Sequence, residues 1–332
     1  MRVLAPMPEA AVDPPREPPT FSIVIAAYEA SGTIGRAVRS ALGQTRPADQ
    51  VIVVDDGSED DLAAALVPFG DEITLIRQEN RGAGAARNTA VAAASGTFIA
   101  ILDADDAYHP GRLEALGELA ESRPDLDLLT TDARLMVDER ATGTFAEHTP
   151  FVTGDQRAAI FQSCFVGGWP AIRRTRFQRI GGFDESLKIA QDWDCWLRAI
   201  LDGALAGFVE EPLYDYFVHP ASLSSARAPS LWERARMLEK AARNPALRPE
   251  ERPALHRALR MHRSRAVMAD AQAVLYDSAP RLRLARHAVA PRLALRAREA
   301  ALLSVAAPSL ARRMIARDRS TEERLGAGRA GA

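Results

Sequence analysis

Residues 50–58 of the chain read QVIVVDDGS, and residues 98–106 read FIAILDADD. Both stretches begin with a short apolar run rich in Val or Ile and end in a group of Asp residues. A short apolar run of this kind is typical of a buried strand. Ligands of open α/β sheets bind in the crevice outside the carboxyl ends of the strands. The sequence therefore places both Asp groups where such a sheet would hold a ligand.

The segments around these runs alternate as expected of strand–helix–strand units. The predicted strands are Phe21–Ala26, Gln50–Val54, Ile73–Arg77 and Phe98–Leu102. The second and third are nearly all apolar, as expected of strands buried on both faces. The predicted helices are one capped by Thr33 and ending at Gly43, one from about Gly84 to Ala94, and one beginning near Pro110. This pattern predicts a mostly parallel sheet covered by helices.

The pattern becomes mixed after about residue 127 and helical after about residue 229. A capping box is predicted at Thr153 and Gln156, and a turn at Gly181-Gly182. A helix is expected from Gln191 to about Ile200, followed by strands near 205–209 and 213–218. Ala, Leu and Arg then dominate, with interspersed prolines. We therefore divide the chain into a disordered Pro-rich leader (1–19), an α/β domain (20–228) and a separate helical basic region (229–332).

Composition indicates a globular protein whose charge is unevenly distributed. The chain has 332 residues, of which 47% are hydrophobic and 26% charged, and its formal net charge is −2. This balance excludes a fibrous or wholly disordered protein. Residues 231–332 carry a net charge of +12, and the preceding residues carry −14. An acidic domain that binds a polyanion needs a cation between the two.

The sequence shows no secretory signal and no membrane-spanning segment. Acidic residues and prolines interrupt the first nineteen positions, and the longest mostly apolar run, Ala300–Ala311, is too short to span a bilayer. Two cysteines, Cys164 and Cys195, make neither a disulfide framework nor a zinc motif. A cytoplasmic location is therefore expected.

The acidic groups also suggest metal chemistry. Asp103 and Asp105 are one residue apart, so in an extended stretch both face one side and offer oxygen ligands suited to Mg²⁺ or Mn²⁺. Turn and helix capping is the alternative role for such Asp residues. Residues 80–88 read NRGAGAARN, which lacks the third glycine of a dinucleotide fingerprint, and no P-loop motif occurs.

Six segments, in this order, resemble the family-two glycosyltransferases with the GT-A fold. They are SIVIAAY (22–28), VVDDGS (53–58), NRG with ARN (80–88), LDADD (102–106), GGFDE with QDWDCWLR (181–198) and the Tyr-x-x-x-His region (214–224). The resemblance covers about residues 20 to 225. It implies an α/β fold with a GT-A-type, Rossmann-like nucleotide-binding domain and a mixed central sheet, followed here by the helical C-terminal region.

The resemblance also implies a reaction and a donor. A sugar would pass from a nucleoside diphosphate sugar, such as a UDP-, GDP- or dTDP-sugar, to an acceptor hydroxyl with inversion. The nucleotide would be bound by the residues at the ends of the first, second and fourth strands and by one arginine, namely Ala27, Tyr28, Asp55, Asp56, Arg87, Asp103 and Ala104. A turn role for Asp55 and Asp56, and a packing role for Arg87, are the alternatives.

The metal and the base follow from the same resemblance. Mn²⁺ or Mg²⁺ would be held by Asp103, Asp105 and His219, and would stabilise the diphosphate leaving group. Asp192 stands where the family has its catalytic base, although Gln191 replaces the Glu that commonly precedes it. A helix cap is the alternative role for Asp192, and a surface position is the alternative for His219.

The acceptor side is less defined. Trp169 and Asp184 fall near the expected acceptor mouth, although core burial is the commoner fate of a Trp. The acceptor would be a glycan, a lipid-linked oligosaccharide or a protein, most simply in polysaccharide synthesis. The basic helices could make peripheral membrane contact, although a charge-rich helical face is more often solvated, and no nucleic-acid module is recognised. Competing functions are a sugar-1-phosphate nucleotidylyltransferase and a scaffold protein that has lost turnover.

Overall fold

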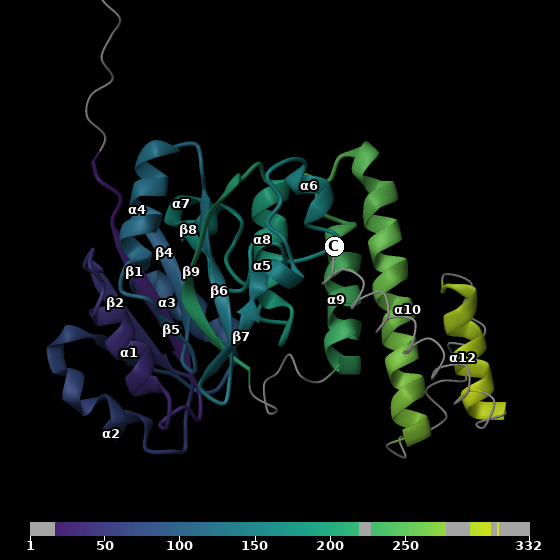
Figure 1. Cartoon of the computed structure of the whole chain (residues 1–332), viewed down its shortest axis with the longest axis horizontal. Helices are drawn as coiled ribbons and strands as arrows, with labels where there is room; N and C mark the ends of the chain where they lie inside the picture. Colours follow the sequence, from purple (N-terminus) through teal and green to yellow (C-terminus); the bar gives the residue numbers. More distant parts are fainter. Residues whose placement is uncertain (1–16, 219–226, 277–292, 307–310, 312–332) are drawn as a thin grey trace, which may run out of the picture.

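The apolar runs of the sequence form the centre of one mixed sheet. The computed structural model describes residues 17–218, 227–276, 293–306 and 311, so most of the predicted leader lies outside the described residues (Figure 1). Nine strands in this part of the chain join in the order β3-β2-β1-β4-β8-β6-β9-β5, with β7 paired to β6. They are β1 (Phe21–Ala27), β2 (Gln50–Asp55), β3 (Thr74–Arg77), β4 (Phe98–Asp103), β5 (Ala107–Tyr108), β6 (Leu128–Val137), β7 (Arg140–Thr144), β8 (Ala171–Arg173) and β9 (Ala206–Phe217).

The helices cover both faces of this sheet and continue beyond it (Figure 1). They are α1 (Ile34–Leu42), α2 (Leu62–Leu66), α3 (Ala83–Ala93), α4 (Arg112–Ser122), α5 (Phe145–His148), α6 (Gln156–Ala159), α7 (Arg174–Arg179), α8 (Gln191–Leu201), α9 (Arg227–Ala241), α10 (Arg252–Tyr276) and α12 (Leu295–Ala306). The 3₁₀ helices η1 (Val67–Glu72) and η3 (Pro249–Glu251) complete the set.

Side chains of the central strands alternate between two apolar clusters. In β2, Ile52 and Val54 pack with α3 and α8 on one face, while Val51 and Val53 pack with α1 and α2 on the other. Because successive side chains of a strand point to opposite faces, a strand covered on both sides must be apolar throughout. The four parallel strands β3-β2-β1-β4 are the Rossmann-like half of the sheet, and β8, antiparallel to β4, makes it mixed.

Three local predictions were wrong. The strand predicted at Ile73–Arg77 is not buried on both faces, because β3 is the edge strand and Leu75 is 44% exposed. The segments 205–209 and 213–218 form the single strand β9, whose register with β6 shifts on both sides of Pro212. Asp155, which accepts a bond from the Ala158 amide (3.0 Å), caps α6 in place of the expected capping box at Thr153.

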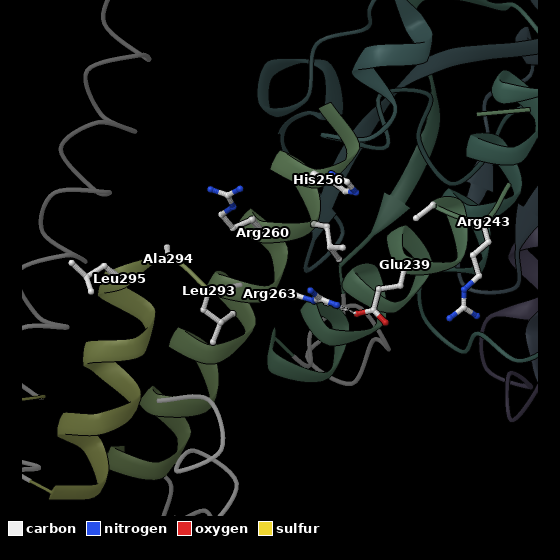
Figure 2. A pocket seen from close by; sticks show the side chains of 10 residues that line it. Glu239, Arg243, His256, Arg260, Arg263, Leu293, Ala294 and Leu295 are labelled. Atoms are coloured by element: carbon white, nitrogen blue, oxygen red, sulfur yellow. Dashed lines mark hydrogen bonds and ion pairs between the residues drawn. The ribbon is translucent and has the colours of Figure 1, made fainter. Parts of the chain in front are cut away.

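The C-terminal helices pack against one another and against the α/β core. Met237 and Leu238 of α9 and Leu255 of α10 belong to the same apolar cluster as α8 and the central strands. Side chains of α9, α10 and the segment that opens α12 line a pocket of about 870 Å³. Figure 2 shows these side chains. None of its lining residues belongs to the strand-end carboxylates. Among the described residues, no helix combines the length and apolar character needed to cross a membrane.

Candidate active site

The carboxylates predicted at the strand ends lie along one edge of the sheet. Strand β1 pairs in parallel with β2 and β4, so Ala27 lies opposite Asp55 and Ala26 lies opposite Asp103. Tyr28 follows β1 and is half exposed (51%). Since parallel strands end at the same edge, the fold brings the two Asp groups to the two sides of the end of β1.

Asp55 and Asp56 are both buried and hydrogen-bonded. Asp55 accepts a bond from the Ser58 amide (2.8 Å) and pairs with Arg77 (3.0 Å). Asp56 accepts bonds from the Gln78 side chain (2.7 Å) and from the amides of Arg81 (3.0 Å) and Gly82 (2.7 Å). Asp56 thus holds the loop that leads into α3. A carboxylate offers about four acceptor positions, so contact with a nucleotide base stays a prediction.

Arg87 and Asp103 form an ion pair at the centre of the site. Arg87 projects from α3, is buried, and donates from Nη2 to Oδ1 of Asp103 at the end of β4. The guanidinium also lies 5.5 Å from the ring centroid of Phe183. Burial acts to lower the pKa of Arg87, but the charge of Asp103 and the bond to it dominate and raise it. A permanent cation therefore stands beside Asp103, where a donor diphosphate is expected.

Asp106 was not predicted as a site residue, yet it anchors the segment Asp103-Ala104-Asp105, here called the DxD segment. Its side chain is buried, and it accepts bonds from the Tyr214 hydroxyl (2.7 Å) and the Phe217 amide (2.8 Å). Burial, and then the charges of Asp103 and Asp105, hold the pKa of Asp106 well above its usual value. The carboxyl groups of Asp103 and Asp105 therefore lie near enough to Asp106 for their charges to affect its pKa. The signal available in the sequence was the third Asp of LDADD.

This clustering fits a hard divalent cation. Asp103 and Asp105 are half-buried and offer oxygen ligands, and the mutual repulsion of the carboxylates falls when a cation binds. No group of three or more potential metal ligands occurs in residues 17–218, 227–276, 293–306 and 311. Mg²⁺ and Mn²⁺ are, however, commonly held by one or two carboxylates together with substrate phosphates. His219, the other predicted ligand, lies outside the described residues.

Asp192 lies in the first turn of α8 and faces the same centre. It is half-buried, and its Oδ1 accepts a bond from the Trp193 amide (2.7 Å). Burial raises the pKa of Asp192; the Trp193 amide and the charge of Arg87 oppose the shift, and the charge of Asp103 adds to it. Arg87 therefore interacts with both acids. The structure brings together Asp103, Arg87 and Asp192 from three elements that are distant in the sequence.

The two residues expected at the acceptor mouth are engaged within the protein. Trp169 is 5% exposed, stacks on Tyr214 (ring centroids 4.8 Å apart) and donates to the Thr131 carbonyl (3.1 Å). Asp184 pairs with Lys240 of α9 and accepts a bond from the Ser186 hydroxyl (2.7 Å). Little of the Trp169 ring is available to an acceptor in this conformation. Acceptor binding by either residue stays a prediction.

Arg36 is a second cation that no sequence motif signalled. Projecting from α1, it donates from Nη2 to the Asp105 carbonyl (2.6 Å) and pairs with Glu139 (3.0 Å). Its guanidinium lies 3.6 Å from the ring centroid of Phe217. Arg36 thus fixes the backbone of the DxD segment from α1.

Comparisons with known proteins bear on the family and the fold of this chain. Residues 22–181 match the family described as Glycosyl transferase family 2. The succinoglycan biosynthesis protein ExoU of Rhizobium meliloti is 33% identical over 63% of this chain and 65% of its own length. An uncharacterized glycosyltransferase of Rickettsia prowazekii is 28% identical over 65% of this chain and 69% of its own length.

Solved structures share the fold. TarS 1–349 of S. aureus, in complex with UDP-GlcNAc, has a TM-score of 0.63 and 17% identity, covering 91% of this chain and 92% of that chain. The mannosyltransferase PcManGT of Pyrobaculum calidifontis, in complex with GDP-Man and Mn²⁺, has a TM-score of 0.53 and 21% identity, covering 88% and 87%. The sheet thus has the GT-A-like fold. Residues 22–181, just under half of the chain, thus form a glycosyl transferase family 2 domain, and over about two thirds of its length the chain is similar to proteins named glycosyltransferases.

Proposed function

We propose that this glycosyltransferase moves a sugar from a nucleoside diphosphate sugar to an acceptor hydroxyl by direct, inverting displacement, with a divalent metal at the DxD segment. The observation that carries the proposal is the convergence of Asp103, Arg87 and Asp192. An acid suited to bind metal, a buried cation and a second acid at a helix start are the groups that such a displacement requires. Arg87 is ion-paired with Asp103, and it is near enough to Asp192 for their charges to affect each other's pKa.

Asp192 is assigned as the general base that takes the proton of the attacking hydroxyl. Its raised pKa makes the carboxylate a stronger base, and a catalytic base is most effective when its pKa lies near the working pH. The charge of Arg87 and the Trp193 amide oppose the shift that burial causes. We expect turnover to fall as the pH is lowered through the pKa of this group.

We assign the donor diphosphate to the side of the site formed by Asp103, Asp105 and Arg87. Asp103 and Asp105 would hold Mn²⁺ or Mg²⁺, and the metal would supply Lewis-acid stabilisation of the leaving diphosphate. Arg87, already charged and buried, offers a donor to the phosphate oxygens without having to be ordered. Asp55, Asp56 and the adjoining Ala27, Tyr28 and Ala104 would line the nucleotide.

The relatives narrow the setting of the reaction. ExoU is named for succinoglycan biosynthesis, which supports a role in polysaccharide synthesis. The fold neighbours bind UDP-GlcNAc or GDP-Man, and one contains Mn²⁺, which supports a UDP- or GDP-sugar donor and a metal. We place the reaction in the cytoplasm, with a glycan, lipid-linked or protein acceptor. Contact of the basic helices with a membrane surface stays a prediction.

The test combines nucleotide binding with turnover. Calorimetry with UDP, GDP, dTDP and CDP, each with Mn²⁺, Mg²⁺ or chelator, should find one nucleotide that binds only with metal, and Asp105→Ala should abolish that binding. Asp192→Asn should keep nucleotide affinity but lose about 10²- to 10⁴-fold in kcat. Asp61→Asn is the matched control, because Asp61 is exposed and makes no capping bond at the start of α2. Full turnover by Asp192→Asn, or retention of donor configuration in the product, would refute the proposal.

A further inference from the structure

The loop that leads into α8 is held from two sides. On the donor side, Glu185 pairs with Arg81 (2.7 Å) and accepts a bond from Asn88 of α3 (3.2 Å). Asn88 also donates to the Phe183 carbonyl (3.0 Å). The loop residues 183–190 thus connect the nucleotide half of the site to the helix that carries Asp192.

On the other side, the loop is held by α9. Glu233 accepts hydrogen bonds from three consecutive backbone amides, Lys188 (2.9 Å), Ile189 and Ala190 (2.8 Å). Ala190 is the N-cap residue of α8, two positions before Asp192. A carboxylate that takes three amides of one turn fixes that turn in position and orientation, since bonds to an ionised acceptor are stronger than neutral ones.

Two further contacts tie α9 to the same region. Lys240, seven residues along the helix, pairs with Asp184, and this bond together with those from Ser186 lowers the pKa of Asp184 to about 2 despite its partial burial. The guanidinium of Arg234 lies 5.7 Å from the ring centroid of Trp193, the residue that follows Asp192 in the chain. The loop and the first turn of α8 are therefore attached to α9 at three successive points.

We propose that Glu233 is a positioning residue for the transfer reaction. It lies outside the segment that matches the family, which ends at residue 181. By holding the amides of residues 188–190, it sets where α8 begins and so where the Asp192 carboxylate lies relative to Arg87 and Asp103. A small displacement of a base from its substrate lowers the rate strongly, so the effect should appear in kcat. The inference rests on the proposed role of Asp192 as the base.

The two carboxylate oxygens of Glu233 accept different numbers of hydrogen bonds, so a series of variants can remove these bonds stepwise. Oε1 accepts from Lys188, while Oε2 accepts from Ile189 and Ala190. Glutamine keeps one acceptor oxygen of the same reach, which suffices for the pair next to α8, whereas alanine keeps none. Glu239→Gln is the matched control. Glu239 lies on the same helix and pairs with Arg263 of α10 (2.7 Å; Figure 2) rather than with the loop.

The experiment compares the wild type with Glu233→Gln, Glu233→Ala, Glu239→Gln and Asp192→Asn. Nucleotide affinity is measured calorimetrically with UDP and GDP in the presence of Mn²⁺, and turnover as nucleotide release from UDP-GlcNAc and GDP-Man. We expect kcat to fall about tenfold or more in Glu233→Ala. Glu233→Gln should lie between it and the wild type, and nucleotide affinity should stay within about twofold in both. Glu239→Gln should match the wild type.

A second measurement covers the case in which Glu233→Ala fails to fold. Hydrogen exchange in Glu233→Gln should become faster at the Lys188 amide, whose acceptor is lost, while exchange in the central strands stays as in the wild type. If kcat of both Glu233 variants equals that of Glu239→Gln, or if kcat and nucleotide affinity fall by the same factor, the positioning role is refuted. If Asp192→Asn retains full turnover, the failure lies instead with the proposed function.

Discussion

Replacing His262 with phenylalanine should make the protein more resistant to acid. His262 lies in α10, is 2% exposed, and meets the ring of Trp193 edge-on with centroids 5.4 Å apart. Burial lowers the pKa of His262 from 6.5 to about 4, and the charges of Arg234 and Arg265 act in the same direction, while the Gln162 carbonyl opposes the shift. The folded protein therefore keeps this imidazole neutral well below the pH at which the unfolded chain protonates it.

The sign and the size of the effect follow from linkage. Because the pKa is lower in the folded state than the ordinary 6.5, the unfolded chain binds the proton first as the pH falls. Stability contributed by the neutral imidazole is complete above pH 6.5 and is lost between about pH 6.5 and 4. At about 1.4 kcal/mol per pKa unit, the full loss is about 3 kcal/mol, of which about 2 kcal/mol is gone by pH 5.

The assay is urea unfolding at pH 7.5 and pH 5 for the wild type, His262→Phe and His256→Phe. His256 is an exposed histidine of the same helix and serves as the control. The fall in the free energy of unfolding between the two pH values should be about 2 kcal/mol smaller in His262→Phe than in the wild type. It should be unchanged in His256→Phe. Equal pH dependence in all three proteins would refute the reasoning. The contributions of the other titrating groups are the same in each protein, so they cancel when the variants are compared.

Two further predictions concern the packing of the site. Gly168→Ala should lower kcat at unchanged nucleotide affinity, because the added Cβ would lie 3.1 Å from Oδ2 of Asp192. The control is Gly154→Ala, whose added Cβ meets no atom within 4 Å and which should have wild-type kinetics. Equal kinetics in both variants would contradict the assigned position of the base. Arg112→Lys should lower the free energy of unfolding by about 2 kcal/mol at pH 7, since one ammonium cannot replace a guanidinium that is fully buried and donates to two acceptors. An unchanged urea midpoint for Arg112→Lys would argue against this account.

The strand-end carboxylates could be predicted because they depend on local pattern. An apolar run buried on both faces has few alternatives to a central strand, and an Asp that ends such a run must lie at the sheet edge. Asp55 and Asp103 were therefore located correctly from the sequence, with β1 between them. The edge strand β3 was harder, because Leu75 is apolar yet 44% exposed, so composition alone suggested burial.

Contacts between distant segments could not be predicted in the same way. The pairing of Asp184 with Lys240, and of Glu233 with the amides before α8, joins residues more than forty positions apart. No periodicity or motif in α9 distinguishes these charges from those of a solvated helix face. The burial of Trp169 likewise depends on Tyr214 from β9, which the sequence placed in a separate segment.

The shared packing of α8 and α9 bears on how chimaeras of such enzymes should be designed. A junction at the start of α9 looks natural in the sequence, since the domain boundary predicted after residue 228 falls there. Such a junction would, however, transplant Asp192 without the glutamate that holds its loop, and would bring Met237 and Leu238 of one parent against the α8 of another. Such a chimaera is therefore better made by moving the segment from the Gly181-Gly182 turn through α9 as one piece.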